Sequence, residues 1–154
     1  MDIKELYQEI VLDHGKNPRN KNKLKSFNKE AKGHNPLCGD KIHIFLKLDG
    51  DKKVEDISFE GEGCAISIAS ASIMTETIKG KEFNVAKKIL EKFLNMLKEG
   101  SKLRINSLSE DENTTMMSLS GVKRFPMRVK CATLAWHTFM HAAEEKKGTA
   151  NTEK

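Results

Sequence analysis

Apolar and polar residues alternate strictly over residues 41–48, which is typical of a β-strand with one buried face. The apolar positions on its expected inner face are Ile42, Ile44, Leu46 and Leu48. Asp49-Gly50-Asp51 follows as a hairpin signal, and residues 54–60 predict the next strand. A weaker alternation over residues 24–35 predicts an earlier strand. Together these segments predict a three-stranded antiparallel sheet.

Helical spacing of apolar residues marks most of the remaining chain. The predicted helices span residues 2–15, 64–78, 84–98 and 127–146. The polar stretch 101–113 predicts a loop or short helix, and residues 114–121 predict another short helix. Because the strands precede most of the helices, we expect an α+β fold with helices packed on one face of the sheet.

The chain has 154 residues, a length that suits one hydrophobic core. We therefore expect a single domain over residues 1–146 and a disordered tail over 147–154. No apolar run reaches the ~18 residues of a membrane span, and no basic-then-apolar leader opens the chain. These features predict a soluble, cytoplasmic protein that does not enter a membrane.

Charge narrows the choice of partners. The chain has 27 Lys and Arg against 22 Asp and Glu, a formal surplus of +5. A nucleic-acid surface would interleave basic and aromatic residues, but there is one Trp and one Tyr, so no nucleic-acid partner is expected. A solvated, lysine-rich surface explains the surplus, and a docking surface for an acidic partner protein is the alternative.

Three cysteines are an odd number and do not suggest a disulfide framework. Cys38 and Asp40 are two residues apart at the start of a predicted strand, so both side chains are expected on the face of Ile42. Cys64 follows Gly61-Glu62-Gly63 at the start of a predicted helix, where the helix dipole favours an anion. A small residue at a tight strand-to-helix junction is the alternative explanation of Cys64. Cys131 lies near the apolar stripe of the last helix.

Three thiolates and one carboxylate form the four-ligand set that zinc prefers. Arg128 and Lys130 flank Cys131, and Lys41 follows Asp40. We expect these cations to offset the negative site and to hold an anionic sulfur species, with ordinary surface charge as the alternative.

His34 remains open as a further ligand. His137 and His141 have an i, i+4 spacing that could bind metal, but their face is expected to be exposed, which favours surface histidines. His14 is expected to be a helix-end residue near the C-terminal end of the helix dipole.

Three motifs in order resemble those of the SufU/IscU family, and the likeness covers roughly residues 2–140. They are Asn35-Pro36-Leu37-Cys38-Gly39-Asp40, Gly61-Glu62-Gly63-Cys64-Ala65-Ile66-Ser67 and Phe125-Pro126-Met127-Arg128-Val129-Lys130-Cys131. IscU scaffolds carry His where this chain has Lys130, and they have a shorter connection between the last two cysteines. Here that connection spans 67 positions, with the extra length expected in about 84–120. Both departures resemble the SufU branch.

The resemblance implies a SufE/NifU-like, IscU-like fold and a role in iron–sulfur cluster assembly. It implies a zinc-dependent sulfur acceptor for a SufS-type cysteine desulfurase, with a SufBCD-type scaffold downstream. Cys38, Asp40, Cys64 and Cys131 would hold the zinc, and Cys38 would receive the persulfide sulfur after a desulfurase histidine replaces it on the metal. Arg128 resembles a family arginine that supports docking or activity.

Two other functions remain open. A scaffold would assemble a transient [2Fe–2S] cluster, and thus bind iron, on the same ligands. Lys130 in place of His removes one ligand that a scaffold would use. A structural-zinc module that binds nucleic acid or protein is the other alternative, but the chain has no C-x-x-C pair.

Overall fold

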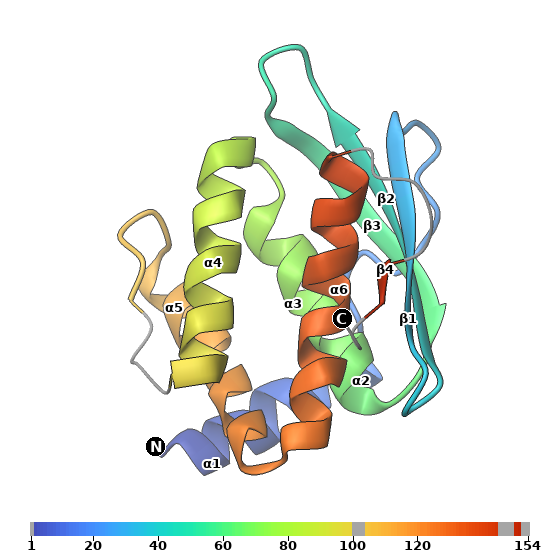
Figure 1. Ribbon diagram of the computed structural model, residues 1–154. Helices are drawn as coiled ribbons and strands as arrows, with labels where there is room; N and C mark the ends of the chain where they lie inside the picture. The colour runs from blue at the N-terminus through green and yellow to red at the C-terminus, as the bar shows by residue number, and fades with distance from the viewer. Residues whose placement is uncertain (1, 100–103, 145–149, 152–154) are drawn as a thin grey trace.

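The computed structural model describes residues 2–99, 104–144 and 150–151. A sheet forms one side of the molecule, α3 (Ala65–Ile78) and α6 (Pro126–Ala143) lie against it, and α4 (Phe83–Glu99) lies beyond them (Figure 1). The predicted α+β class and the packing of helices on one face of the sheet are confirmed.

The predicted antiparallel sheet is formed by β1 (Lys29–Asn35), β2 (Asp40–Leu48) and β3 (Val54–Glu62). β2 is central and pairs with both neighbours. A two-residue strand, β4 (Ala150–Asn151), adds to β1 in parallel, giving the order β3-β2-β1-β4. The predicted tail includes this strand, and its other residues lie outside the described part of the chain.

Two strand boundaries differ from the prediction. β1 begins at Lys29 and not at 24, because the side chain of Asn28 pairs with the backbone of Leu48 and ends the ladder there. Phe27 instead packs on Phe45, with ring centroids 5.1 Å apart. β3 continues through Gly61 to Glu62, although the glycines predicted a break. Gly61 has φ 155°, and a side chain there would collide with the backbone carbonyl of Lys41.

The predicted first helix is one continuous helical segment with a π turn in its middle, η1 (Tyr7–Val11). Its outer parts are α1 (Ile3–Leu6) and α2 (Leu12–Lys16). The polar stretch after α4 contains α5 (Glu110–Ser118), which begins at a capping box between Ser109 and Glu112. It continues into the 3₁₀ helix η2 (Leu119–Arg124). Residues 100–103 and 145–146 of the predicted elements lie outside the described residues.

Small residues let α3 and α6 approach closely beneath the sheet. The Ser70 hydroxyl donates to the carbonyl of Ala132, 2.5 Å away, and accepts from the indole N–H of Trp136 at 3.1 Å. Phe93 of α4 stacks on Trp136, with centroids 4.7 Å apart. These contacts fix the positions of the two helices that carry Cys64 and Cys131 at their N-terminal ends.

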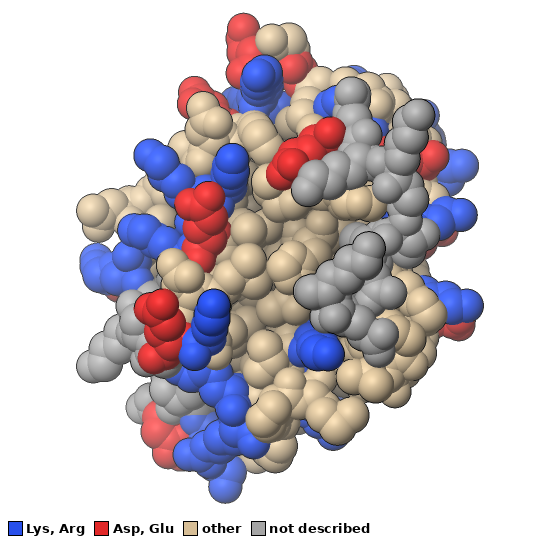
Figure 2. Space-filling model, viewed as in Figure 1, with Lys and Arg blue, Asp and Glu red and all other residues tan. Residues whose placement is uncertain are grey.

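Charged side chains of both signs cover the margins of the face drawn in Figure 2, around an uncharged centre. Within the described part of the chain, no helix combines the length and the apolar character that crossing a membrane requires.

Candidate metal and thiol site

A four-residue turn between β1 and β2 carries Cys38. The Gly39 N–H donates to the carbonyl of Asn35 at 2.9 Å and closes the turn. Gly39 has φ 72°, a left-handed conformation that glycine adopts without a steric penalty. The Cys38 side chain is exposed. It therefore stands at the surface, on backbone that no helix or strand constrains.

Asp40 begins β2 and is fully buried on the same side as Ile42 and Ile44, as strand alternation predicted. Its Oδ1 accepts the backbone N–H of Cys64 at 2.8 Å. That N–H belongs to the residue before the first turn of α3, where backbone donors lack helical partners. Asp40 thus ties the start of β2 to the start of α3.

Gly63 makes this close approach possible. A Cβ at Gly63 would collide with the Asp40 carboxylate, and the residue has φ 154°. The glycine before Cys64 therefore serves the packing of Asp40 as well as the turn into the helix.

The three thiols and the carboxylate come from three separate regions of the chain and meet at one place. Cys64 is the N-cap residue of α3 and is half-buried, whereas Cys131 lies in the second turn of α6 and is 1% exposed. The Sγ atoms of Cys131 and Cys38 are 3.4 Å apart. The Sγ of Cys64 lies 3.8 Å from Oδ2 of Asp40.

These separations fit a tetrahedral zinc ion, whose ligand bond lengths imply ligand atoms about 3.5–3.8 Å apart. The ligand atoms of Cys38, Asp40 and Cys131 all lie within 4.8 Å of one another. Cys64 does not come that close to all three. Because Cys64 is the N-cap residue, rotation about its χ1 moves the thiol without moving the helix. The donor set therefore fits a thiophilic metal.

Cys131 shows why this cluster calls for a cation. Burial raises the pKa of its thiol far above the usual value, and the neighbouring Cys38, Asp40 and Cys64 groups raise it further. Thiols and a carboxylate crowded together offer lone pairs and few donors. A metal ion satisfies such a set and allows the thiols to lose their protons.

The sequence reasoning gave no role to Asn35, yet its amide lies between two of the candidate ligands. Asn35 is fully buried, and its Nδ2 is 3.5 Å from both Asp40 Oδ2 and Cys131 Sγ. It also faces Asp40 directly in the β1–β2 register. The sequence could have indicated this contact, because the two residues that flank a tight turn face each other across the strands. Asn35 is placed to orient the ligands.

The cations near Cys131 lie at the rim. Arg128 is exposed, with its guanidinium 5.9 Å from the ring centroid of Phe125, and Lys130 is half-buried. Neither has a hydrogen bond or ion pair to the four candidate ligands among the contacts of the described residues. Three large apolar side chains are also exposed at this end, namely Leu37 (52%), Phe125 (50%) and Met127 (59%). The rim thus combines positive charge with apolar surface.

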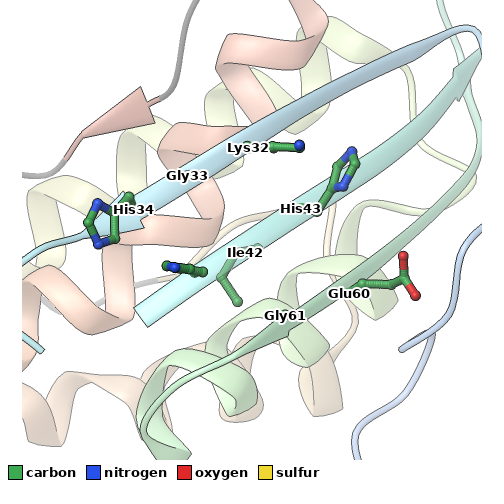
Figure 3. Close-up of a pocket in the computed structure, with 8 residues that line it drawn as sticks. Lys32, Gly33, His34, Ile42, His43, Glu60 and Gly61 are labelled. Carbon is green, nitrogen blue, oxygen red and sulfur yellow. The ribbon is translucent and has the colours of Figure 1, made fainter. Parts of the chain in front are cut away.

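Other residues considered for the site lie elsewhere. Lys41 and His34 face each other on the outer side of the sheet, where both line a pocket (Figure 3). The expectation that Lys41 offsets the charge of the ligands is wrong, because strand alternation turns it away from Asp40. His137 is exposed and His141 half-buried on α6. Within the described residues, no histidine joins the group of candidate ligands.

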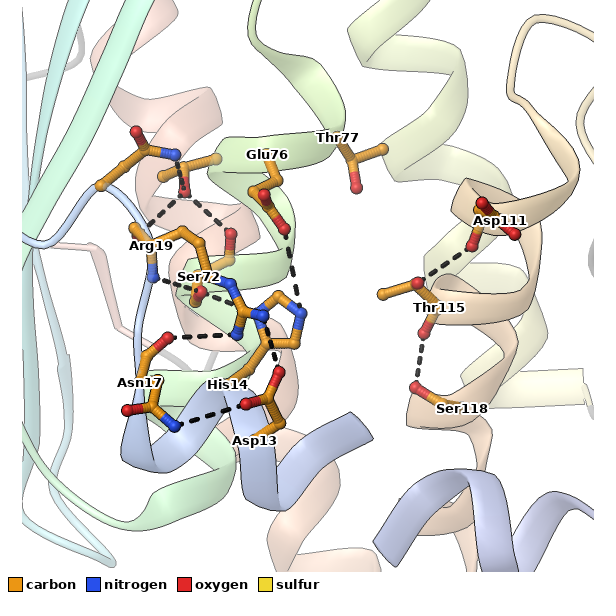
Figure 4. Close-up of polar contacts among 12 residues, drawn as sticks. Asp13, His14, Asn17, Arg19, Ser72, Glu76, Thr77, Asp111, Thr115 and Ser118 are labelled. Atoms are coloured by element: carbon orange, nitrogen blue, oxygen red, sulfur yellow. Dashed lines mark hydrogen bonds and ion pairs between the residues drawn. The ribbon is translucent and has the colours of Figure 1, made fainter. Parts of the chain in front are cut away.

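His14 forms a second polar cluster with Ser72 and Arg19, farther along α3 from Cys64. We expected His14 to be a helix-end residue near the dipole, but it is buried, with Nδ1 2.8 Å from the Ser72 hydroxyl (Figure 4). The backbone N–H of Arg19 donates to the same hydroxyl at 2.8 Å, and its guanidinium pairs with Asp13 at 2.6 Å. Burial lowers the pKa of His14 to about 4, with the charge of Arg19 next in importance. This cluster anchors the N-terminal helix to α3.

The site's three motifs lie within a stretch that matches a known family. A family model described as the NifU-like N terminal domain matches residues 6–132. The chain belongs to the NifU-like N-terminal domain family. All four candidate ligands fall inside the matched residues. The resemblance to SufU and IscU stated from the motifs is therefore confirmed.

Members of this family are similar to the chain over nearly its whole length. The zinc-dependent sulfurtransferase SufU of Bacillus subtilis is 43% identical over 143 residues, 93% of this chain and 92% of that protein. The iron–sulfur cluster assembly scaffold protein IscU of Thermotoga maritima is 35% identical, covering 94% and 97%. The crystal structure of FiSufU from Fervidobacterium islandicum AW-1 has a TM-score of 0.78 at 35% identity, covering 90% and 97%. The likeness to the SufU branch thus extends to the fold.

Proposed function

We propose that the protein acts in iron–sulfur cluster assembly as a zinc-bound sulfur acceptor. It would take persulfide sulfur from a SufS-type cysteine desulfurase onto Cys38 and pass it to a SufBCD-type scaffold. The main support is that an exposed thiol, Cys38, lies 3.4 Å from the buried thiol of Cys131 within the cluster that contains Asp40. The zinc-dependent name of the Bacillus subtilis relative supports the choice of metal.

Cys38, Asp40, Cys64 and Cys131 would hold the zinc. Bound zinc keeps thiols deprotonated, lowers their nucleophilicity and protects them from oxidation. Asn35 orients Asp40 and Cys131 from behind, within 3.5 Å of both. Partners of this kind typically change metal affinity about 10–100-fold.

Cys38 is the thiol best placed to react. Cys131 is held in α6 and Cys64 at the start of α3, whereas Cys38 lies on an exposed turn next to Gly39. In the transfer, the Cys38 thiolate attacks the outer sulfur of the desulfurase persulfide. A new sulfur–sulfur bond forms at Cys38, the sulfur–sulfur bond of the donor breaks, and the desulfurase cysteine leaves as a thiolate. No oxidant or reductant is consumed.

Arg128 and Lys130 support this reaction from the rim. They flank Cys131 in the sequence, and the Sγ of Cys131 lies 3.4 Å from that of Cys38, so their charges would suit the transferred sulfur, which is anionic. The exposed side chains of Leu37, Phe125 and Met127 provide apolar area around the thiol for contact with the donor protein. A productive encounter needs both features, because the reacting sulfur atoms must be brought together while water is excluded.

A [2Fe–2S] scaffold is the second candidate, and the names of the IscU relatives favour it. Cysteine thiolates bind iron–sulfur clusters as well as zinc. Lys130, directly before Cys131, supplies no ligand atom to such a cluster at neutral pH. A scaffold function would thus rest on the same three thiols and Asp40.

Sulfur transfer can be tested directly. The purified protein is analysed for metal, then incubated with a cysteine desulfurase and cysteine and examined by intact mass and peptide mapping. We expect about one zinc per chain, added sulfur on Cys38, and faster desulfurase turnover. Cys38→Ala should lose both effects, while Lys92→Ala, an exposed change on α4, should keep them. Stimulation that survives Cys38→Ala would overturn the proposal, and a stable coloured cluster without stimulation would favour the scaffold.

A further inference from the structure

The positive charge of the chain is concentrated in one segment. Residues 16–53 hold 11 of the 27 Lys and Arg residues but 4 of the 22 Asp and Glu residues. This local surplus of seven exceeds the surplus of five for the whole chain. The segment contains β1 and β2 and the stretch that leads into them. β3 adds four acidic residues and no basic one. The basic surplus therefore belongs to β1, β2 and the stretch that leads into them, and not to the whole sheet.

A trough of about 380 Å³ crosses the outer face of this sheet. Gly33, Ile42 and Gly61 are register partners on three neighbouring strands, and their row forms the floor. The floor is backbone, because the Ile42 side chain is buried on the other face. Side chains of the two flanking rows form the walls. These are Lys32, His43 and Glu60 on one side and His34 and Lys41 on the other.

Figure 3 shows Lys32, His43 and Glu60 following one another across the three strands, with His34 beyond the floor row. Two cross-strand pairs are basic on both strands: Lys32 faces His43, and His34 faces Lys41. Directly opposed side chains have Cβ atoms about 4.5–5.5 Å apart, so the trough brings two lysines and two histidines close together. On the other side of β2, His43 faces Glu60 and Lys41 faces Glu62.

Other parts of the same sheet pair opposite charges. Lys47 lies 3.8 Å from Glu55, and within the trough the Nε2 of His43 lies 3.2 Å from Glu30. By contrast, within the part of the chain that the structure describes, no carboxylate pairs with Lys32 or Lys41. Two ammonium groups thus border one hollow without an ion pair, although Glu60 lines it and Glu62 is the β3 register partner of Lys41. An anionic group that enters the hollow would meet both ammonium groups.

We propose that this trough binds an acidic segment of a partner protein. The segment would lie along the floor, and its carboxylates would reach Lys32 in one wall and Lys41 in the other. Glu60 at one end of the trough disfavours a continuous polyanion such as a nucleic-acid backbone. The walls and floor also offer no Phe, Tyr or Trp ring for base stacking. A peptide of mixed sequence fits both constraints.

The trough lies one register step from the candidate metal site. The pair His34–Lys41 is followed directly by the pair Asn35–Asp40, and then by the turn that carries Cys38. A segment bound in the trough would hold its protein beside that turn, on the opposite face of the sheet from the buried ligands. The inference rests on the sheet surface alone and holds whether zinc or a cluster occupies the ligands.

Binding is tested with a fluorescein-labelled peptide of alternating Glu and Ser, using the full-length protein and fluorescence anisotropy. Lys32→Glu/Lys41→Glu should weaken binding at least about tenfold and remove most of its salt dependence. The matched pair Lys88→Glu/Lys92→Glu, exposed on α4, changes net charge equally and should stay within about twofold. Equal losses in both pairs would mean attraction by net charge only and would overturn the proposal.

Nuclear magnetic resonance on the unmodified protein gives a second test that does not depend on the variants folding. The peptide should shift the backbone amides of Gly33, Ile42 and Gly61 more than those of α4. Unlabelled single-stranded oligonucleotide and inorganic phosphate are added as competitors. If either displaces the peptide at lower concentration than an unlabelled peptide of the same sequence, the trough is a phosphate site and the proposal is wrong.

Discussion

Two polar clusters lie along α3, and they are completed in different ways. Around Ser72, the hydroxyl meets His14 and the N–H of Arg19, and Arg19 pairs with Asp13 (Figure 4). At the start of the helix, Cys64 and Asp40 meet Cys38 and Cys131. Among the described residues, the donors that reach this group from outside its side chains are the Cys64 backbone N–H and the Asn35 amide. The first cluster is satisfied by the protein itself, whereas the second has an excess of lone pairs.

This difference separates a structural role from a chemical one. Buried polar groups that find partners within the chain stabilise one conformation. Buried thiols and a carboxylate that crowd one another need an ion from outside, and folding and metal binding are then coupled. If so, changes in the cluster of thiols and Asp40 should alter metal affinity, and changes in the cluster around Ser72 should alter the free energy of unfolding.

Asp40→Asn should give the largest effect on metal binding. The amide can still accept the N–H of Cys64, now 2.8 Å from Oδ1, so the fold is kept while the anionic ligand is lost. Zinc affinity should fall more than about 100-fold, since outer-shell partners alone change it about 10–100-fold. Competition with a chromophoric chelator measures this, and a thermal melt of the metal-free form should stay close to that of the parent. An affinity within tenfold of the parent would remove Asp40 from the ligand set.

Gly63→Ala should disturb the same cluster through the backbone. The new Cβ would collide with the Asp40 carboxylate, and φ 154° is a conformation that other residues rarely adopt. Backbone strain of this kind costs about 1–3 kcal/mol, and zinc affinity should fall together with stability. Gly50→Ala is the matched control, because nothing lies within 4 Å of a Cβ there. Urea unfolding and chelator competition on both variants test the expectation, which fails if the two behave alike.

Ser72→Ala tests the other cluster. It leaves His14 Nδ1 and the Arg19 N–H without the hydroxyl that lies 2.8 Å from each. Unpaired buried groups cost about 1–3 kcal/mol, so the free energy of unfolding should fall by about 2 kcal/mol while zinc affinity stays unchanged. Ser26→Ala, at an exposed position, should change stability by less than about 0.5 kcal/mol. Loss of zinc in Ser72→Ala would show that the two clusters are not independent.

The fold was predictable where periodicity is strong. The alternation in β2 and the apolar stripe of α4 predicted both elements to within one residue at each end. Strand parity also predicted that Asp40 lies on the same face as Ile42. What the pattern could not provide was contact between side chains on different strands. The role of Asn35 depends on its register with Asp40, and the basic trough depends on register across three strands.

Misplaced residues show the same limit. Lys41 was expected to offset the negative charge of the ligands because it adjoins Asp40 in sequence, yet adjacent residues in a strand face opposite ways. His14 was judged by its helix end, although its contact with Ser72 joins residues 58 positions apart. Local rules place a residue on an element, but they do not reveal which distant residue meets it.

The smallest expected effect is the pH dependence that His14 confers. Its pKa is about 4 in the folded protein, lowered by burial from an ordinary value of 6.5, so the unfolded chain binds a proton that the folded state excludes. This contribution to stability is complete above pH 6.5 and is lost as the pH falls from 6.5 toward 4. Between pH 7.5 and 5.5 it amounts to about 1 kcal/mol. Urea unfolding of the metal-free protein at both values measures it, and His14→Gln should flatten that part of the slope. If the free energy of unfolding depends on pH equally in the parent and in His14→Gln, His14 is solvated in the folded protein. The Ser72 cluster would then not be a buried, self-satisfied group, and its contrast with the thiol cluster would be wrong.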